Sequence, residues 1–284
     1  MIPDWETDTL FVSDLLEKKE PDLYAALQKT LKGVPIGVIQ GTADIWCRDY
    51  MPIQLDQDRF CQFKYAPDYL REYPDLVTLP EKFRLPFMAN HQQESIVLDG
   101  GNVVASRTKV ILTEKIYKEN PKIYRPTLRK RLKEIFQAEC IFIPKEAEDD
   151  VGHSDGVLRF VDENRVLMSD FSIVDPGYGD RVRKVLERNK LEVLTFPMFE
   201  EKRTRRKKDE IAPAVGIYIN YLRVGNIIVV PGFNRDEEDA KAVARIKEVV
   251  PGAVVSQVQC RKLAEKGGVL NCISWTIKRG RAQA

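Results

Sequence analysis

The stretch GIYINYLRVGNIIVVPGFNRDEEDAKAVARIKEVVPGAVVSQV, residues 216–258, holds the pattern that decides the fold. Residues 216–222 and 226–231 are short runs rich in β-branched and aromatic side chains, and such runs predict two neighbouring strands. Residues 236–250 carry apolar side chains at helical spacing, which predicts an amphipathic helix. Residues 253–258 are again apolar and predict a third strand. The stretch therefore predicts a strand–strand–helix–strand unit.

The same order of elements occurs twice more upstream, in residues 102–144 and 156–196. Three such units in a row indicate a repeat architecture. Two other stretches fit the unit less cleanly. Residues 51–99 supply three strands with an uncertain segment between the last two, and residues 9–40 supply two strands and a helix but lack one strand.

The C-terminal run CISWTIK, residues 272–278, can supply the missing strand. That pairing would close a ring of five α/β units, with the two chain ends side by side and the sheet edges hidden. In such a ring, the loop that follows the last strand of each unit emerges at one common end. We therefore expect residues far apart in the sequence to meet in one pocket.

Most residues able to do chemistry lie in or beside those loops. They are Asp49, Asp99, His153, Asp155 and Cys272. A cysteine thiolate attacks electrophilic carbon, and a histidine is the natural acid–base partner because its ordinary pKa lies near neutral pH. Carboxylates suit a planar guanidinium, whose N–H donors they accept two at a time. On an extended strand, His153 and Asp155 would project to the same face.

Composition limits the other possibilities. The chain has 284 residues, a formal net charge of +2 and 43% hydrophobic residues, as expected of an ordinary globular protein. The near-neutral charge argues against a nucleic-acid partner, and no apolar run reaches the length of a membrane span. The five cysteines form no CxxC pair and there are only two histidines, so neither a disulfide framework nor a metal site is expected. We expect a cytoplasmic protein.

Six motifs, taken in order, resemble those of the agmatine deiminase and bacterial (Porphyromonas-type) peptidylarginine deiminase family, within the guanidine-modifying, or pentein, superfamily. The motifs are DIWCRDYMP (44–52), VLDGGNVV (97–104), ILTEKIYKENP (111–121), DDVGHSDGVLRFV (149–161), GIYINYLRVGNIIVVPGF (216–233) and GGVLNCISW (267–275). The resemblance implies a five-bladed pseudo-symmetric α/β propeller built from the repeated unit, with residues 1–284 forming a single deiminase domain. Each motif alone is common, and the order is what makes the set specific.

The resemblance also implies roles for individual residues. Cys272 matches the family nucleophile, His153 the general acid and base, and Glu114 a carboxylate that orients the histidine. Positions that match substrate-binding residues or line the pocket are Asp49, Asp155, Asp99, Asn220 and Trp46. The family more often has glutamate at the position of Asp99.

The implied activity is hydrolysis of a C–N bond in a guanidino compound, through a covalent thiouronium on Cys272 and without a metal or organic cofactor. Agmatine, converted to N-carbamoylputrescine and ammonia as in putrescine and polyamine synthesis, is the expected substrate. The alternatives are a peptidyl- or free-arginine deiminase, an amidinotransferase, or a catalytically silent guanidino-compound binder. Free arginine would need a cation for its carboxylate, and the candidates are Arg48, Arg159 and Arg223. The expected partner is this small substrate, with a homodimer as a further possibility.

Structural explanations remain open for each residue taken alone. Cys272 could be a core residue, Asp99 could make a turn, Glu114 could open a helix, and Asn220 could bond a neighbouring loop. The family usually has histidine where this chain has Asn271. The basic run at residues 202–208 is interpreted as a solvated loop; the alternatives are that it covers the pocket or that it attracts an anionic partner.

Overall fold

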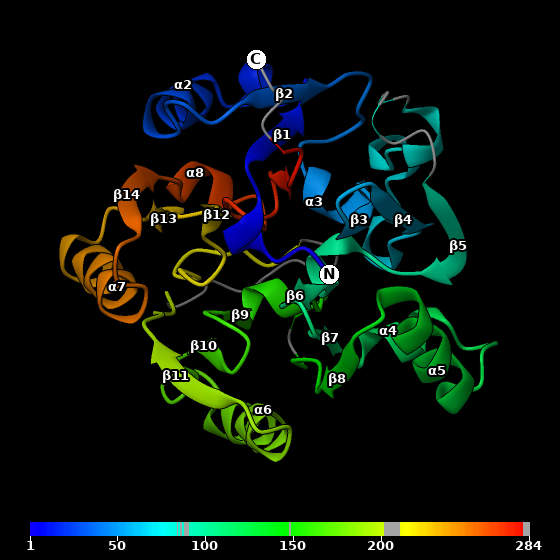
Figure 1. The fold of residues 1–284 in the computed structure, drawn as a ribbon. Helices are drawn as coiled ribbons and strands as arrows, with labels where there is room; N and C mark the ends of the chain where they lie inside the picture. The colour runs from blue at the N-terminus through cyan, green and yellow to red at the C-terminus, as the bar shows by residue number, and fades with distance from the viewer. Residues whose placement is uncertain (84, 86, 88–90, 148, 202–210, 281–284) are drawn as a thin grey trace.

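The computed structural model describes residues 1–83, 85, 87, 91–147, 149–201 and 211–280. Within these residues, fifteen strands form five three-stranded sheets. Figure 1 shows the sheets arranged one after another around the middle of the molecule. The strands, in spatial order within each sheet, are β15 (Trp275–Ile277), β1 (Thr9–Ser13) and β2 (Ile36–Ile39); β3 (Ile53–Asp56), β4 (Arg59–Lys64) and β5 (Gln92–Val97); β6 (Val104–Ala105), β7 (Lys109–Thr113) and β8 (Glu139–Ile143); β9 (Leu158–Phe160), β10 (Arg165–Ser169) and β11 (Glu192–Phe196); and β12 (Leu222–Val224), β13 (Ile227–Gly232) and β14 (Val254–Gln259).

All five sheets share one pattern of pairing. The middle strand pairs antiparallel with one neighbour and parallel with the other. A parallel pair needs a crossover connection, and in four units this connection is helical. The connecting helices are α1 (Leu16–Lys19) with α2 (Pro21–Thr30), α4 (Lys115–Glu119) with α5 (Arg125–Phe136), α6 (Pro176–Arg188), and α7 (Asp236–Val249). This confirms the expected mixed α/β fold of repeated units.

In the second unit, the uncertain segment between β4 and β5 forms short 3₁₀ helices. They are η2 (Asp68–Leu70), η3 (Pro74–Leu76) and η4 (Pro80–Lys82). The helix expected in residues 13–32 is interrupted at Glu20, because the following Pro21 disfavours a helical conformation in the residue before it. The strand expected in residues 216–222 forms only from Leu222 onward.

The ring is closed by the two ends of the chain. The C-terminal strand β15 pairs antiparallel with the N-terminal strand β1, with Phe11 opposite Trp275. This confirms the pairing expected from residues 272–278. Apolar clusters fill the spaces between neighbouring sheets; one of them joins Phe11 and Ile39 of the first unit to Phe60 of the second and to Trp275.

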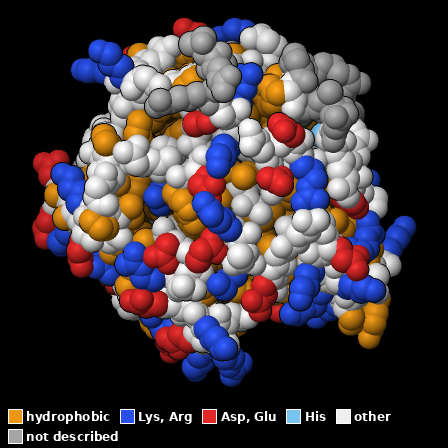
Figure 2. Space-filling model, in the orientation of Figure 1, with side chains coloured by type: hydrophobic (Ala, Val, Ile, Leu, Met, Phe, Trp, Pro, Cys, Tyr) orange, Lys and Arg blue, Asp and Glu red, His pale blue; other side chains and the backbone are white. Residues whose placement is uncertain are grey.

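The surface carries charges of both signs. Basic and acidic side chains are interspersed over the face seen in Figure 2. Among the described residues, every helix is too short or too polar to cross a bilayer.

We predict that the ring depends on Trp275. Its side chain is 2% exposed and lies 5.3 Å from the Phe11 ring between centroids, and its indole N–H donates to the Pro52 carbonyl at 2.8 Å. Trp275→Ala should lower the free energy of unfolding by about 3–5 kcal/mol in chemical denaturation. Val254→Ala, at a position that is 56% exposed, should change it by less than about 0.5 kcal/mol. Equal stabilities would contradict a closing role for β15.

Candidate active site

His153 lies between two carboxylates. Its Nε2 is 3.0 Å from Asp99 Oδ2, and its Nδ1 is 3.5 Å from Asp49 Oδ1. Burial lowers the pKa of His153, but the charge of Asp49 and the hydrogen bond to Asp99 outweigh it and raise the pKa to about 9. The imidazole is therefore protonated at neutral pH and can act first as an acid.

Two glycines allow this close approach. Asp99 follows β5, and the short helix η6 (Gly100–Asn102) comes directly after it. A Cβ on Gly101 would lie 2.4 Å from His153 Nδ1, and one on Gly100 would lie 2.0 Å from the Arg48 carbonyl oxygen. The Gly101 N–H also donates to Asp49 Oδ1 at 3.1 Å. The glycine pair therefore brings a backbone segment against the histidine where any side chain would collide.

Cys272 lies in a turn that precedes β15. Its Sγ is 3.4 Å from the amide oxygen of Asn220, and its carbonyl accepts a hydrogen bond from the Arg48 N–H at 3.1 Å. Arg48 belongs to α3 (Cys47–Tyr50), which also carries Asp49. Burial and then the charges of Asp155 and Asp49 raise the pKa of the Cys272 thiol well above its ordinary value. In the absence of a cation the sulfur is a thiol rather than a thiolate.

Asp155 is held by the residue beside the cysteine. The side-chain amide of Asn271 donates to Asp155 Oδ2 at 2.6 Å, and the Asn271 N–H donates to the Asn220 side-chain oxygen at 3.1 Å. Asn271 therefore links Asp155 to the asparagine that contacts Cys272. In the sequence, Asn271 differs from the histidine that is usual in the family, and its position next to Cys272 is the signal that indicates a place in the site.

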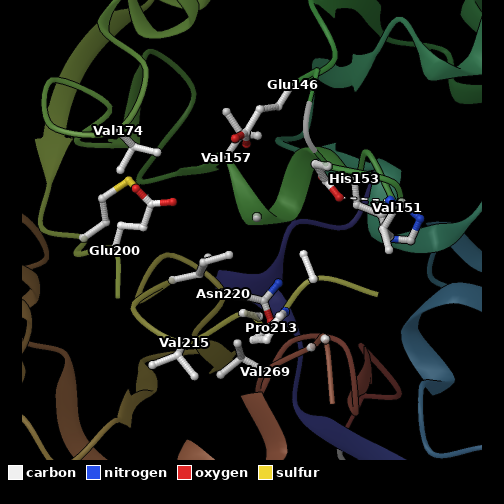
Figure 3. A pocket seen from close by; sticks show the side chains of 18 of the residues that line it. Glu146, Val151, His153, Val157, Val174, Glu200, Pro213, Val215, Asn220 and Val269 are labelled. Carbon is white, nitrogen blue, oxygen red and sulfur yellow. Dashed lines mark hydrogen bonds between the residues drawn. The ribbon is translucent and has the colours of Figure 1, made fainter. Parts of the chain in front are cut away.

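These groups share one pocket of about 740 Å³ (Figure 3). His153, Asp155, Asn220 and Cys272 all line it. In Figure 3, Val157 lies across the pocket from Val215 and Val269. The described lining includes many acidic side chains and no lysine or arginine; the acids are Glu146, Asp149, Asp155, Asp175, Glu200, Glu201 and Glu265. A pocket with this lining suits a cationic ligand.

The remaining predicted residues surround the pocket. Asp49 and Asp99 contact the ring of His153, which lines the pocket, although neither acid belongs to the described lining itself. Trp46 packs against Gly268, a residue of the pocket wall, since a Cβ on that glycine would lie 2.5 Å from the indole. Among the described residues, no group of three or more His, Cys, Asp or Glu side chains could hold a metal ion.

Two expectations were wrong. Glu114 does not orient the histidine: it sits at the start of α4 with an exposed side chain, whereas both ring nitrogens of the buried His153 face Asp99 and Asp49. The helix-opening explanation for Glu114 agrees with this position. Asp155 is also not on a strand. It lies in the 3₁₀ helix η7 (Ser154–Gly156), although it lines the same pocket as His153. The basic run 202–208 lies outside the described residues.

We predict that the charge of Asp155 suppresses ionisation of Cys272. Asp155→Asn removes a negative charge near the sulfur, so the pKa of the thiol should fall and more of the reactive thiolate should form. Alkylation of Cys272 by iodoacetamide at pH 8, followed by peptide mass spectrometry, should be several-fold faster than in the unmodified protein. Asp236→Asn, at the exposed start of α7, is the matched control and should leave the rate unchanged. A rate unaltered by Asp155→Asn would rule out this electrostatic coupling.

The chain is similar to known proteins over most of its length. Residues 7–277 match the family model of Porphyromonas-type peptidyl-arginine deiminase. An agmatine deiminase of Ectopseudomonas mendocina is 29% identical over 213 residues, which cover 65% of this chain and 58% of that protein. The match thus spans less than two thirds of the curated relative.

Solved structures show the same fold. The agmatine deiminase of Enterococcus faecalis superposes with a TM-score of 0.79 at 16% identity, covering 99% of this chain and 96% of that one. The putative arginine deiminase from Porphyromonas gingivalis gives a TM-score of 0.77 at 17% identity, covering 98% of each chain. The chain belongs to the Porphyromonas-type peptidyl-arginine deiminase family.

Proposed function

We propose that this protein is a hydrolase that deiminates a guanidino compound, and that its five sheets form the five-bladed α/β propeller of the guanidine-modifying enzymes. One observation carries the proposal. Cys272 near the C-terminus lines one pocket with His153 and Asp155 from the middle of the chain, and Asp49 and Asp99 lie at the histidine. A nucleophile, an acid–base group and carboxylates for a planar cation are the groups that such a reaction needs.

Substrate binding would begin the reaction by ionising the sulfur, whose proton passes to solvent because His153 is already protonated. Asp155 and Asp49 accept hydrogen bonds from the guanidinium, whose positive charge offsets theirs. The same charge lowers the raised pKa of the Cys272 thiol, because an opposite charge nearby favours the thiolate. The nucleophile therefore forms only when its target is present.

The chemical steps then follow from the state of His153. The Cys272 thiolate attacks the guanidinium carbon and forms a C–S bond. The imidazolium of His153 gives its proton to the departing nitrogen, the C–N bond breaks, and ammonia leaves a thiouronium on the sulfur. The now neutral imidazole takes a proton from water, the resulting hydroxide adds to the same carbon, and the C–S bond breaks. The proton of the added hydroxyl passes to the departing sulfur, so the products are a ureido compound and the restored thiol, with His153 again protonated.

The charge of the pocket favours agmatine, with N-carbamoylputrescine as the product. Agmatine carries an amine in place of the carboxylate of free arginine, and the described lining is acidic without a lysine or arginine. The three arginines considered for a substrate carboxylate are engaged elsewhere: Arg48 donates to the Asn271 carbonyl, Arg159 pairs with Asp4, and Arg223 donates to the Gly225 carbonyl. Not one of the three belongs to the described lining.

A capped arginine peptide is the second candidate. It has no α-carboxylate at the arginine, so the same acidic lining would accept it, and the matched family is described by peptidyl-arginine. Ammonia release from agmatine, a capped arginine peptide and free arginine should rank the three in that order. A preference for free arginine would overturn the substrate assignment. Release of ammonia only when an acceptor amine is added would indicate an amidinotransferase.

Cys272→Ala should abolish turnover, because no other group can form the covalent intermediate. We expect the rate of ammonia release to fall by about 10³-fold or more. Cys140→Ala is the matched control, since Cys140 is also a partly exposed free cysteine but lies on β8 and does not line the pocket. It should retain the full rate. An active Cys272→Ala variant would refute the mechanism, and binding of agmatine by an unmodified protein that releases no ammonia would identify a binder.

A further inference from the structure

Lys115 is a buried cation behind the proposed active site. It is 1% exposed, at the first position of α4. Its Nζ lies 3.2 Å from Asp99 Oδ2, 3.0 Å from Glu119 Oε1 and 3.4 Å from Asp68 Oδ1. The Nζ also lies 4.8 Å from the centre of the Tyr69 ring. A lysine is rarely buried so completely unless it is paired, and here three carboxylates surround it.

Lys115 and His153 contact the same carboxylate oxygen, that of Asp99. Asp99 Oδ2 faces both Lys115 Nζ at 3.2 Å and His153 Nε2 at 3.0 Å. The other oxygen, Oδ1, is buried and has no hydrogen-bond partner among the described residues. The orientation of the Asp99 carboxylate toward His153 is therefore set by two donors on one oxygen, and Lys115 is one of them.

Lys115 also balances the charge around this oxygen. Two carboxylates, Asp99 and Asp49, face the imidazole, and with nothing opposing them they would hold its proton too tightly for an acid that must later act as a base. The positive charge of Lys115 works against this and lowers the pKa of His153, which still settles at about 9. The same charge helps to lower the pKa of Asp99, although burial raises it.

The other titratable groups that face this cluster come from several elements. They are Asp49 on α3, Asp68 and Tyr69 on η2, Tyr65 after β4, Glu119 on α4, Lys145 after β8, and Asp155 and Cys272 in the pocket. Glu119 shares the Lys115 ammonium with Asp99. Burial and then the charge of Asp99 raise the pKa of Glu119 to about 7, although Lys115 lowers it. If Lys115 were removed, Glu119 would take up a proton.

We infer that Lys115 is a positioning residue for the acid–base group: through the shared oxygen of Asp99 it holds that carboxylate in place and offsets the negative charge facing His153. The consequence for turnover rests on the proposed function, whereas the link between Lys115 and the histidine does not. The residue lies outside the described pocket lining and acts through Asp99 rather than on the substrate.

Nuclear magnetic resonance tests the link directly, because the chain contains only two histidines, His91 and His153. In protein labelled at histidine, two imidazole titrations are expected, and His153→Gln assigns them. Lys115→Met should raise the midpoint of His153 by roughly one pH unit, since a like charge is removed, and should leave that of His91 in place. Lys115→Arg keeps the charge and should restore the midpoint to within a few tenths of a unit.

Lys130→Met is the matched control for loss of a lysine. The Lys130 side chain is 78% exposed on α5, and its removal should move neither midpoint. If Lys115→Met does not fold, the double variant Lys115→Met/Glu119→Leu removes the buried ion pair as a unit and should show the same upward shift. An unchanged His153 midpoint in a folded variant without Lys115 would overturn the inference.

Turnover supplies a second readout. In Lys115→Met, kcat for deimination should fall about tenfold with KM unchanged, because the imidazolium gives up its proton less readily. The alkaline limb of the kcat profile should move to higher pH by the same amount as the His153 midpoint, and Lys115→Arg should recover both. If Lys115→Met shifts the His153 midpoint but the unmodified protein releases no ammonia, only the proposed function is contradicted. If the unmodified protein releases ammonia and Lys115→Met leaves the His153 midpoint unchanged, only the role of Lys115 is contradicted.

Discussion

The antiparallel pairing of β15 with β1 is the constraint on which the site depends. The turn that carries Cys272 is followed within three residues by β15, so the position of the sulfur is set by the pairing of that strand with the N-terminal strand. Trp275 anchors the pair against aromatic side chains of two units. The backbone bond from Arg48 to the Cys272 carbonyl then joins the turn to the loop of the first unit. The strand pairing that closes the ring therefore also sets the position of Cys272 in the site.

A second constraint is the density of buried charge. Asp49, Asp99 and Asp155 are all almost completely buried, and the first two contact one histidine. Burying a charge is unfavourable unless it is paired, and here cations from different elements pair with the buried carboxylates. His153 faces two of the acids, and Lys115 contacts the same oxygen of Asp99 as the histidine does. The guanidinium of the proposed substrate would supply the missing positive charge beside Asp155 and Cys272.

Much of this arrangement could be predicted from the residue pattern. The alternation of short apolar runs with one helical stretch predicted the repeated unit, and the spare strand at residues 272–278 predicted closure. Both rest on periodicity, which a single sequence displays directly. Once the ring was assumed, the loops carrying His153, Asp155 and Cys272 had to emerge together, and the structure places all three in one pocket.

The contacts of individual loop side chains could not be predicted from the residue pattern. The family resemblance implies that Glu114 orients His153, but a match of sequence positions does not fix where a loop side chain points, and the carboxylate at His153 Nε2 is that of Asp99. Lys115 is the neighbour of Glu114, and no pattern separates a buried lysine from the exposed glutamate before it.

The sequence by itself determined the repeated α/β unit, the ring closure and the candidate thiol and imidazole, Cys272 and His153, which share one pocket, because these follow from apolar spacing and from residue chemistry. Only the tertiary structure decided which acid holds the histidine and which cation balances that acid. Those contacts join residues that are 54 and 16 positions apart, and they depend on how separate loops pack at the centre of the ring.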